Sequence, residues 1–315
     1  MRLNSTEKMH RFKPWHVLKK NSIVDIIAPA GGVADISIIE KLKSLLKSWQ
    51  LIPRISPDLF GPDLLCANSD EKRFQQLKEA LLNSSSQAIW CLRGGYGSTR
   101  LIPYLLKLTA PEKCKLFIGF SDITVLHLFL QQKWHWQTLH GPSLNQVVRH
   151  LIEAENSTEL REIIFGQLQQ LDYSLKSYHR PNKSLDCIQA PLTGGSLSLV
   201  QTSLGTDWQI ETNDKILFLE DVNEFAYRID RMLQHLQQSG ILNHLKALLL
   251  GDFTFPAKLE EEKIQAVLER FAKEQNFPVL RCPDIGHGKK NRCLPLGTSA
   301  LLDLNKNQLT IKITG

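Results

Sequence analysis

The sequence lacks any stretch that is long and apolar enough to cross a membrane. No run in its 315 residues approaches the ~18 consecutive apolar residues of a transmembrane helix. The first twenty residues, MRLNSTEKMHRFKPWHVLKK, are polar and basic and contain no apolar segment of the kind found in secretory signals. These absences predict a protein that is neither exported nor embedded in a membrane.

Cysteine is sparse, and its spacing forms no motif. The six cysteines, at positions 66, 91, 114, 187, 282 and 293, form no C-x-x-C pair. A chain of this size needs no disulfides to hold its core, so we interpret them as reduced thiols of a cytoplasmic protein. The ten histidines form no H-E-x-x-H motif and no Cys/His spacing of a zinc site. We therefore expect no metal and no cofactor.

An excess of one charge sign is also nearly absent. Lys and Arg number 38 against 32 Asp and Glu, a net charge of +6. The aromatic residues, 8% of the chain, are not interleaved with a basic stripe, so nucleic-acid binding is not supported. The 42% of hydrophobic residues is ordinary for a globular protein, and the length suits two domains.

The first 150 residues alternate between strand and helix patterns. Short apolar runs predict strands at 23–28, 51–55, 88–92 and 115–120. Helical spacing of apolar residues predicts helices at 38–49, 69–82, 101–108 and 121–132. Such alternation predicts an α/β fold with a Rossmann-like parallel sheet, whose ligands bind at the carboxyl ends of the strands.

The second half has a different pattern. A polar stretch at 151–190 is predicted to link an N-terminal domain, 1–150, to a β-rich α/β domain, 191–315. In that domain we expect strands at 215–222, 246–253 and 278–284, helices at 226–240 and 263–275, and a hairpin turning at 305–307.

Two strand-to-helix turns of the first half could carry chemistry. Ser121 lies where N–H groups at a helix start favour a developing negative charge, although G-F-S-D does not meet the G-x-S-x-G motif. A simple helix cap is the alternative. The turn RGGYGST (93–99) could be a phosphate cradle, an oxyanion hole or a tight turn. It lacks the third glycine and the lysine of nucleotide-binding motifs.

Two residues of the second half are candidates for an acid and a base. Glu220 ends the apolar strand ILFLE and could orient a histidine, or be a solvated loop acid. His287 is flanked by glycines in DIGHGKKNRC and could act as a general base near neutral pH, or be an exposed loop residue. His127 is interpreted as a packed helix residue.

Taken together, nine segments resemble the LD-carboxypeptidase family, the murein tetrapeptide carboxypeptidases. They follow the family's order and span residues 23 to 300, nearly the whole chain. The segments are IIAPAGG, SDEKRFQQLKEAL, AIWCLRGGYGSTRLIPYL, GFSDITVLH, LHGP, GGSLSLVQTSLGT, ILFLEDVNEFAYRIDRMLQHL, LLGDF and IGHGKKNRCLPLG. The sequence departs from the pattern at Ala30, where the family has serine, and at Asn223, where it has glycine.

The resemblance implies a catalytic triad and an oxyanion hole. Ser121 matches the nucleophile, Glu220 the acid that orients the imidazole, and His287 the general base. The oxyanion hole would consist of the backbone N–H groups of Gly95 and Asp122. The departures do not touch the triad, but they bear on fine substrate specificity.

The resemblance also implies a function: a cytoplasmic serine peptidase that releases the C-terminal D-alanine from a muropeptide tetrapeptide in peptidoglycan recycling. Members of the family are often homodimers, so we expect a homodimer here. One alternative is a microcin-C-type immunity peptidase that hydrolyses acyl-nucleotide amides. Another is a non-catalytic nucleotide-binding module that uses RGGYG. An exopeptidase must also bind a terminal carboxylate, for which we expect donors from the basic loop 288–292 or from backbone N–H groups near RGGYG.

Overall fold

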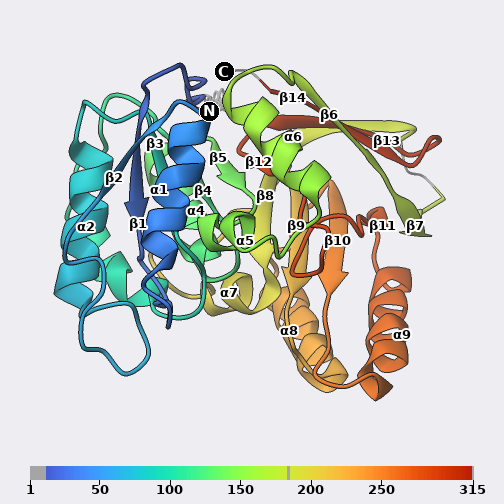
Figure 1. Ribbon diagram of the computed structural model, residues 1–315. Coiled ribbons are helices and arrows are strands. Elements are labelled where there is room, and N and C mark those ends of the chain that lie inside the picture. Colours follow the sequence, from blue (N-terminus) through green and yellow to red (C-terminus); the bar gives the residue numbers. More distant parts are fainter. Residues whose placement is uncertain (1–11, 183–184, 314–315) are drawn as a thin grey trace, which may run out of the picture.

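Two sheets lie side by side in the computed structural model, which describes residues 12–182 and 185–313 (Figure 1). Colours follow the sequence, so strands from the first half of the chain are drawn in blue to green and those from the second half in yellow-green to red. No helix in these residues is both long and apolar enough to span a membrane. Residues 1–11, part of the segment in which we expect no secretory signal, lie outside the described residues.

The first sheet has the strand order β12-β5-β4-β3-β1-β2. Its strands from the first half all run parallel: β1 Ile23–Ile27, β2 Ile52–Ile55, β3 Ala88–Cys91, β4 Leu116–Gly119 and β5 Thr138–His140. Every residue of β3 and β4 is buried, as expected for central strands covered on both faces. The four predicted strands are confirmed, and β5 is an addition.

Helices connect these strands as the sequence pattern predicts. They are α1 Ile38–Ser48, α2 Asp70–Leu82, α3 Ile102–Leu105, α4 Thr124–Trp134 and α5 Leu144–Val148, with 3-10 turns at Ser98–Leu101 and Ser121–Ile123. Ser69 caps α2 by accepting a hydrogen bond from the N–H of Lys72 (3.4 Å). The helix expected at 121–132 begins with the 3-10 turn, so Ser121 lies at the start of this turn and not within an α-helix.

The second sheet has the strand order β6-β14-β13-β8-β9-β10-β11-β7. Its centre, β8 Cys187–Ser196, β9 Ile216–Asp221, β10 Ala247–Phe253 and β11 Val279–Arg281, is parallel. The outer strands β6 Gln170–Ser174, β7 Lys176–His179, β13 Ser299–Asp303 and β14 Gln308–Lys312 are antiparallel. Helices α7 Leu197–Thr202, α8 Ala226–Gln238 and α9 Leu259–Lys273 connect the parallel strands. The α/β fold with a β-rich second half is confirmed.

The segment predicted as a linker contains regular structure. Residues 151–190 include α6 Ala154–Ile164 and the strands β6 and β7, which both belong to the second sheet. In addition, β12 Leu294–Leu296 from the second half pairs antiparallel with β5 and completes the first sheet. Residues from the predicted linker thus contribute strands to the second sheet, and a strand from the second half of the chain belongs to the first sheet. The domain boundaries at 150 and 191 stay a prediction.

Candidate active site

Ser121 lies at a sharp turn between β4 and α4. Its backbone φ is +63°, in the left-handed region that side chains other than glycine rarely adopt. Holding a serine there costs about 1–2 kcal/mol, and such strain clusters at functional sites. The turn leaves Ser121 half-buried, whereas the preceding β4 is fully buried. This is the backbone geometry of a nucleophile elbow, although the surrounding motif differs.

Glycines permit the close packing around this turn. A Cβ on Gly119 would lie 2.7 Å from the side chain of Ile123, within the turn itself. A Cβ on Gly94, in the turn after β3, would lie 2.7 Å from the Cβ of Ser121 and 3.0 Å from its Oγ. One of the glycines packed around the serine turn therefore comes from the neighbouring loop and not from the local sequence.

Glu220 and His287 form a direct hydrogen-bonded pair. The Nδ1 of His287 lies 2.6 Å from Oε2 of Glu220, which is fully buried at the end of β9. The other carboxylate oxygen, Oε1, accepts a hydrogen bond of 2.6 Å from the hydroxyl of Ser196. Both oxygens of the buried carboxylate are thus satisfied, and the imidazole is held with Nε2 available for proton transfer.

This pairing shifts both pKa values in opposite directions. Burial alone would raise the pKa of Glu220, but the charge and hydrogen bond of His287 outweigh it and hold the pKa below its usual range. Burial alone would lower the pKa of His287, but the charge and hydrogen bond of Glu220 raise it above its ordinary value. The imidazolium form of His287 is therefore favoured, as a base that takes up a proton requires.

The glycines on either side of His287 pack against Asp252 at the end of β10. A Cβ on Gly286, whose φ is +145°, would lie 2.8 Å from the Cβ of Asp252. A Cβ on Gly288 would lie 2.7 Å from a carboxylate oxygen of the same residue. The N–H of Asp252 also donates to the carbonyl of Ile285 at 2.8 Å. The flanking glycines are therefore needed to seat the histidine loop on the second sheet.

The end of β8 is packed against the start of α4. The N–H of Ser196 donates to the hydroxyl of Thr124 (3.0 Å), three residues after Ser121. A Cβ on Gly195 would lie 2.4 Å from the same hydroxyl oxygen. Ser196, which ends β8 and binds Glu220, therefore lies next to the start of α4, the helix that follows the nucleophile.

The rings of Phe120 and His287 are in contact, with centroids 4.7 Å apart. Phe120 directly precedes Ser121, so the structure brings the predicted base beside the predicted nucleophile. No hydrogen bond joins Ser121 to His287 within the described part of the chain. Catalytic hydrogen bonds are often loose in the absence of substrate and tighten when it binds.

Gly95 and Asp122 lie on the two loops that meet at Ser121. Gly95 has φ +117°, and a Cβ there would lie 3.1 Å from the Cα of Gly31. The side chain of Asp122 is buried and accepts a hydrogen bond from the N–H of Ser98 (2.8 Å), while burial raises its pKa. Asp122 therefore also ties the RGGYG loop to the nucleophile turn.

Arg73 is a site-organising residue that sequence reasoning missed. Its guanidinium is fully buried and donates to the carbonyls of Asn68 and Gly97, each at 3.0 Å, and to the carbonyl of Pro29. It thus binds three loops at the carboxyl ends of the strands. The only indication in the sequence is its place on the face of α2 that also carries buried apolar residues.

Two further histidines lie behind the site. His127, as predicted, is packed inside, with Nε2 2.8 Å from the carbonyl oxygen of Gly119, and burial lowers its pKa to about 3. His140 is also fully buried, and its ring lies 6.1 Å from that of Phe120. Burial lowers the pKa of His140 to about 4. Both rings are therefore neutral near pH 7 and leave His287 as the site's titrating imidazole.

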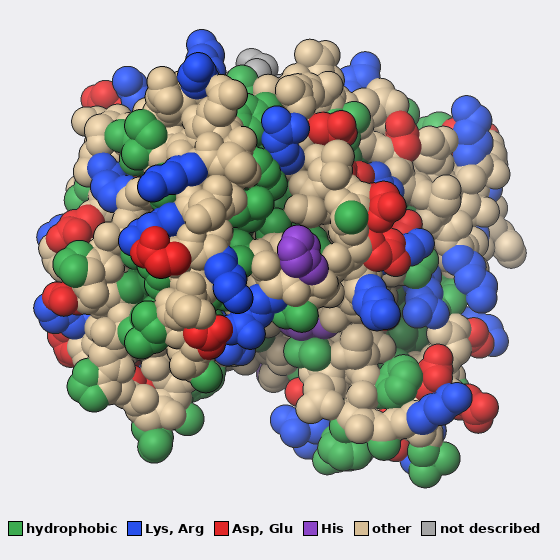
Figure 2. Space-filling model, viewed as in Figure 1, with side chains coloured by type: hydrophobic (Ala, Val, Ile, Leu, Met, Phe, Trp, Pro, Cys, Tyr) green, Lys and Arg blue, Asp and Glu red, His purple; other side chains and the backbone are tan. Residues whose placement is uncertain are grey.

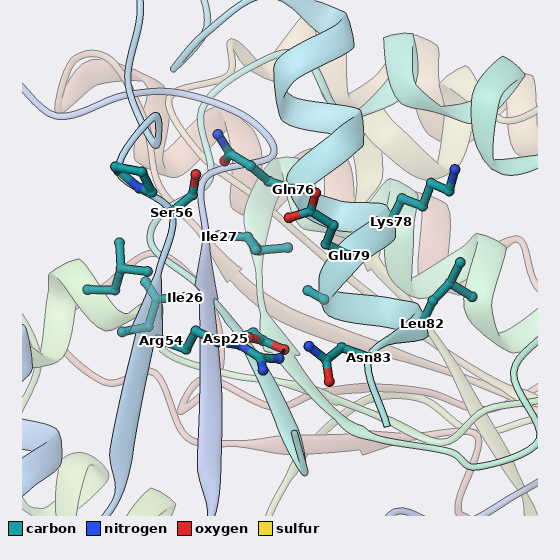
Figure 3. A pocket seen from close by; sticks show the side chains of 13 residues that line it. Asp25, Ile26, Ile27, Arg54, Ser56, Gln76, Lys78, Glu79, Leu82 and Asn83 are labelled. Carbon is teal, nitrogen blue, oxygen red and sulfur yellow. Dashed lines mark hydrogen bonds and ion pairs between the residues drawn. The ribbon is translucent and has the colours of Figure 1, made fainter. Parts of the chain in front are cut away.

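A cavity of about 530 Å³ lies apart from this site, between α2 and the strands β1 and β2 (Figure 3). The ion pair of Arg54 and Asp25, 2.7 Å between Nη2 and Oδ2, lines it. None of the predicted catalytic residues lines this cavity. In the part of the chain that is described, no three His, Cys, Asp or Glu side chains form a potential metal site.

Comparison with known sequences matches both halves of the chain to one family. Residues 24–141 match the LD-carboxypeptidase N-terminal domain, and residues 189–302 match the LD-carboxypeptidase C-terminal domain. The chain belongs to the LD-carboxypeptidase family. The resemblance inferred from the sequence is therefore confirmed, and with it the class of carboxypeptidase.

Relatives of this LD-carboxypeptidase extend over nearly its whole length. A provisionally named carboxypeptidase of Rickettsia conorii is 42% identical over 298 residues, 94% of this chain and 92% of that protein. The murein tetrapeptide carboxypeptidase of Pseudomonas aeruginosa is 29% identical over 293 residues, which cover 90% of this chain and 94% of that protein.

Solved structures give the same picture of the fold. The muramoyltetrapeptide carboxypeptidase of Oxalobacter formigenes has a TM-score of 0.77 at 29% identity, covering 93% of this chain and 99% of that one. An MccF-like protein of Bacillus anthracis has a TM-score of 0.80 at 22% identity, covering 96% and 99%. At that identity, the second likeness concerns the fold alone.

Proposed function

We propose that this LD-carboxypeptidase is a serine peptidase that releases the C-terminal D-alanine from a muropeptide tetrapeptide. It would cut the bond after the L-centre of the diamino acid. The observation that supports this most is the chain of hydrogen bonds from Ser196 through Glu220 to His287, which ends beside the strained Ser121. The relatives named for murein peptides support the substrate class.

The proposed mechanism follows from the groups at the site. His287 takes the proton of the Ser121 hydroxyl as its oxygen attacks the peptide carbonyl, and Glu220 stabilises the imidazolium that forms. The N–H groups of Gly95 and Asp122 would donate to the oxyanion. The imidazolium then protonates the departing amine of D-alanine, and water, deprotonated by His287, hydrolyses the ester that remains on Ser121.

A cytoplasmic location, a role in peptidoglycan recycling and a homodimeric state belong to the same proposal. The alternative, hydrolysis of acyl-nucleotide amides, would use the same residues, and neighbours of the MccF type share the fold. The connection between β10 and α9 is only five residues long, 254–258, which leaves little chain for nucleotide contacts there. This favours the peptide substrate.

The decisive experiment is incubation with a muropeptide tetrapeptide and measurement of free D-alanine. We expect release from the peptide with a free terminal carboxylate, and little or none from the C-terminal amide or from the peptide that ends in L-alanine. Equal turnover of all three peptides would contradict an LD-carboxypeptidase activity. Hydrolysis of an acyl-nucleotide amide without D-alanine release would favour the alternative, and binding of a nucleotide without any hydrolysis would favour a non-catalytic module.

A further inference from the structure

Two of the three cations in the basic loop after His287 are already paired with carboxylates of the protein. The Nζ of Lys290 lies 3.3 Å from the carboxylate of Asp284. The guanidinium of Arg292 lies 2.6 Å from the carboxylate of Glu159. Of the loop's three cations, only Lys289 has no ion pair among the described residues. This loop therefore offers a substrate carboxylate one unpaired ammonium group, that of Lys289, and no unpaired guanidinium.

Arg93 opens the RGGYG turn and lies against the loop that follows β1. Its Nη1 donates to the carbonyl of Gly32 at 2.9 Å. Its guanidinium carbon is 3.6 Å from the position that a Cβ on Gly31 would occupy. The next residue, Gly94, is the one packed against Ser121. The guanidinium is thus held against the loop that follows β1, and Arg93 directly precedes the glycine that packs on the nucleophile turn.

The guanidinium of Arg93 is available to a ligand. Arg93 is exposed, and no carboxylate of residues 12–182 or 185–313 pairs with it. The nearby acid of the same loop region, Asp35, pairs with Arg149 at 3.7 Å instead. A guanidinium has five N–H donors in a fixed fork, so one bond to Gly32 leaves enough for a bidentate carboxylate. Figure 2 shows Lys and Arg side chains along the notch between the two halves of the molecule.

We propose that Arg93 binds the terminal carboxylate of the peptide and so restricts the enzyme to the last residue of its substrate. The inference rests on the proposed peptidase function. One extended residue spans about 3.5 Å, so the carboxylate of the departing residue must lie within one residue of the bond that Ser121 attacks. The Nε of Arg93 is 3.8 Å from the Cβ position of Gly95, whose N–H is the proposed oxyanion donor. The two groups can therefore serve adjacent parts of one bound peptide.

The test measures binding without turnover, in the Ser121→Ala background, by calorimetry with the tetrapeptide and with its C-terminal amide. We expect Arg93→Gln to weaken binding of the free acid about 10- to 100-fold, because a hydrogen-bonded charge pair is lost, and to leave binding of the amide unchanged. Arg93→Lys should fall between the two. Arg161→Gln, which removes an exposed guanidinium over Phe165 on α6, is the matched control and should change neither affinity.

The same substitutions in the enzyme with Ser121 intact separate the two possible failures. If the enzyme releases no D-alanine from the tetrapeptide, the proposed function is wrong. If it releases D-alanine but Arg93→Gln prefers acid over amide as strongly as the parent does, only the role of Arg93 is wrong. Equal affinity of the Ser121→Ala protein for acid and amide would overturn that role as well.

Discussion

Replacing Ser196 by alanine tests whether the buried hydrogen bond behind the triad contributes to catalysis. The hydroxyl of Ser196 donates to Oε1 of Glu220 at 2.6 Å, and both residues are almost completely shielded from solvent. The other oxygen of Glu220 is bound to His287. Ser196→Ala therefore leaves one oxygen of a buried carboxylate without a donor, and no water can reach it without rearrangement.

The magnitude follows from the charge on the acceptor. A hydrogen bond to a charged group contributes about 1.5–3 kcal/mol, and a tenfold rate change corresponds to about 1.4 kcal/mol. If the whole free energy of this hydrogen bond is lost in the transition state, in which His287 is imidazolium, kcat falls about 10- to 150-fold. The KM should change little, because Ser196 lies behind the acid and not in the cleft. The pKa of Glu220 should rise, since a donor to its charged form is gone.

Ser203→Ala is the matched control. Ser203 is fully buried at the C-terminal end of α7, the helix that Ser196 precedes, and its hydroxyl donates to the neutral carbonyl of Val200 at 2.7 Å. Both variants should lower the thermal midpoint, but only Ser196→Ala should lower kcat, measured as D-alanine release. An unchanged kcat in Ser196→Ala, at a stability loss equal to that of Ser203→Ala, would refute the reasoning.

Five other predictions concern the site. Ser121→Ala should keep its circular dichroism spectrum and lose about 10⁴- to 10⁶-fold in kcat; a folded variant with a tenth of the parent rate would exclude Ser121 as nucleophile. Activity should rise with pH as His287 loses its proton, above its ordinary pKa because of Glu220. In Glu220→Gln kcat should fall by about 10⁴, and the rise should move to lower pH, because burial then acts on His287 without the carboxylate; a rise at unchanged pH would contradict the pairing. Gly94→Ala places a Cβ 2.7 Å from that of Ser121 and should reduce both kcat and the thermal midpoint; full activity would show that the loop yields easily. Exhaustive chelation should leave kcat unchanged, and a loss restored by Zn²⁺ would reveal a metal requirement.

The elements that were predicted correctly are those whose pattern is local. The strands at 88–92 and 115–120 read as apolar runs because parallel strands are buried on both faces. The start of the helix at 69–82 is indicated by Ser69, a residue type that caps helices and does so here. Glu220 and His287 stood out because one ends an apolar strand and the other is flanked by glycines, and the structure brings them together.

The elements that were missed depend on partners far away in the chain. β12 is three residues long, and it is a strand because β5 offers it a free edge about 150 residues earlier. Ser196 resembles any serine before a helix until its bond to Glu220 is seen. Arg73 is one of four successive charged residues at the start of α2, and its burial follows from the three carbonyls it binds in other loops. The spacing of apolar residues along the sequence does not predict such contacts between distant segments.

The position of the site follows from how strain and buried charge are supported. The left-handed backbone of Ser121 and the solvent-free carboxylate of Glu220 each oppose folding, so each must be held by structure that is stable without it. Both lie at the carboxyl ends of fully buried parallel strands, β4 and β9. The contact of Thr124 with Ser196 then fixes one strand end against the other. A substitution that removes the hydrogen bond between Thr124 and Ser196 should therefore lower activity without unfolding either sheet. Neither sheet needs this bond for the hydrogen bonds between its own strands.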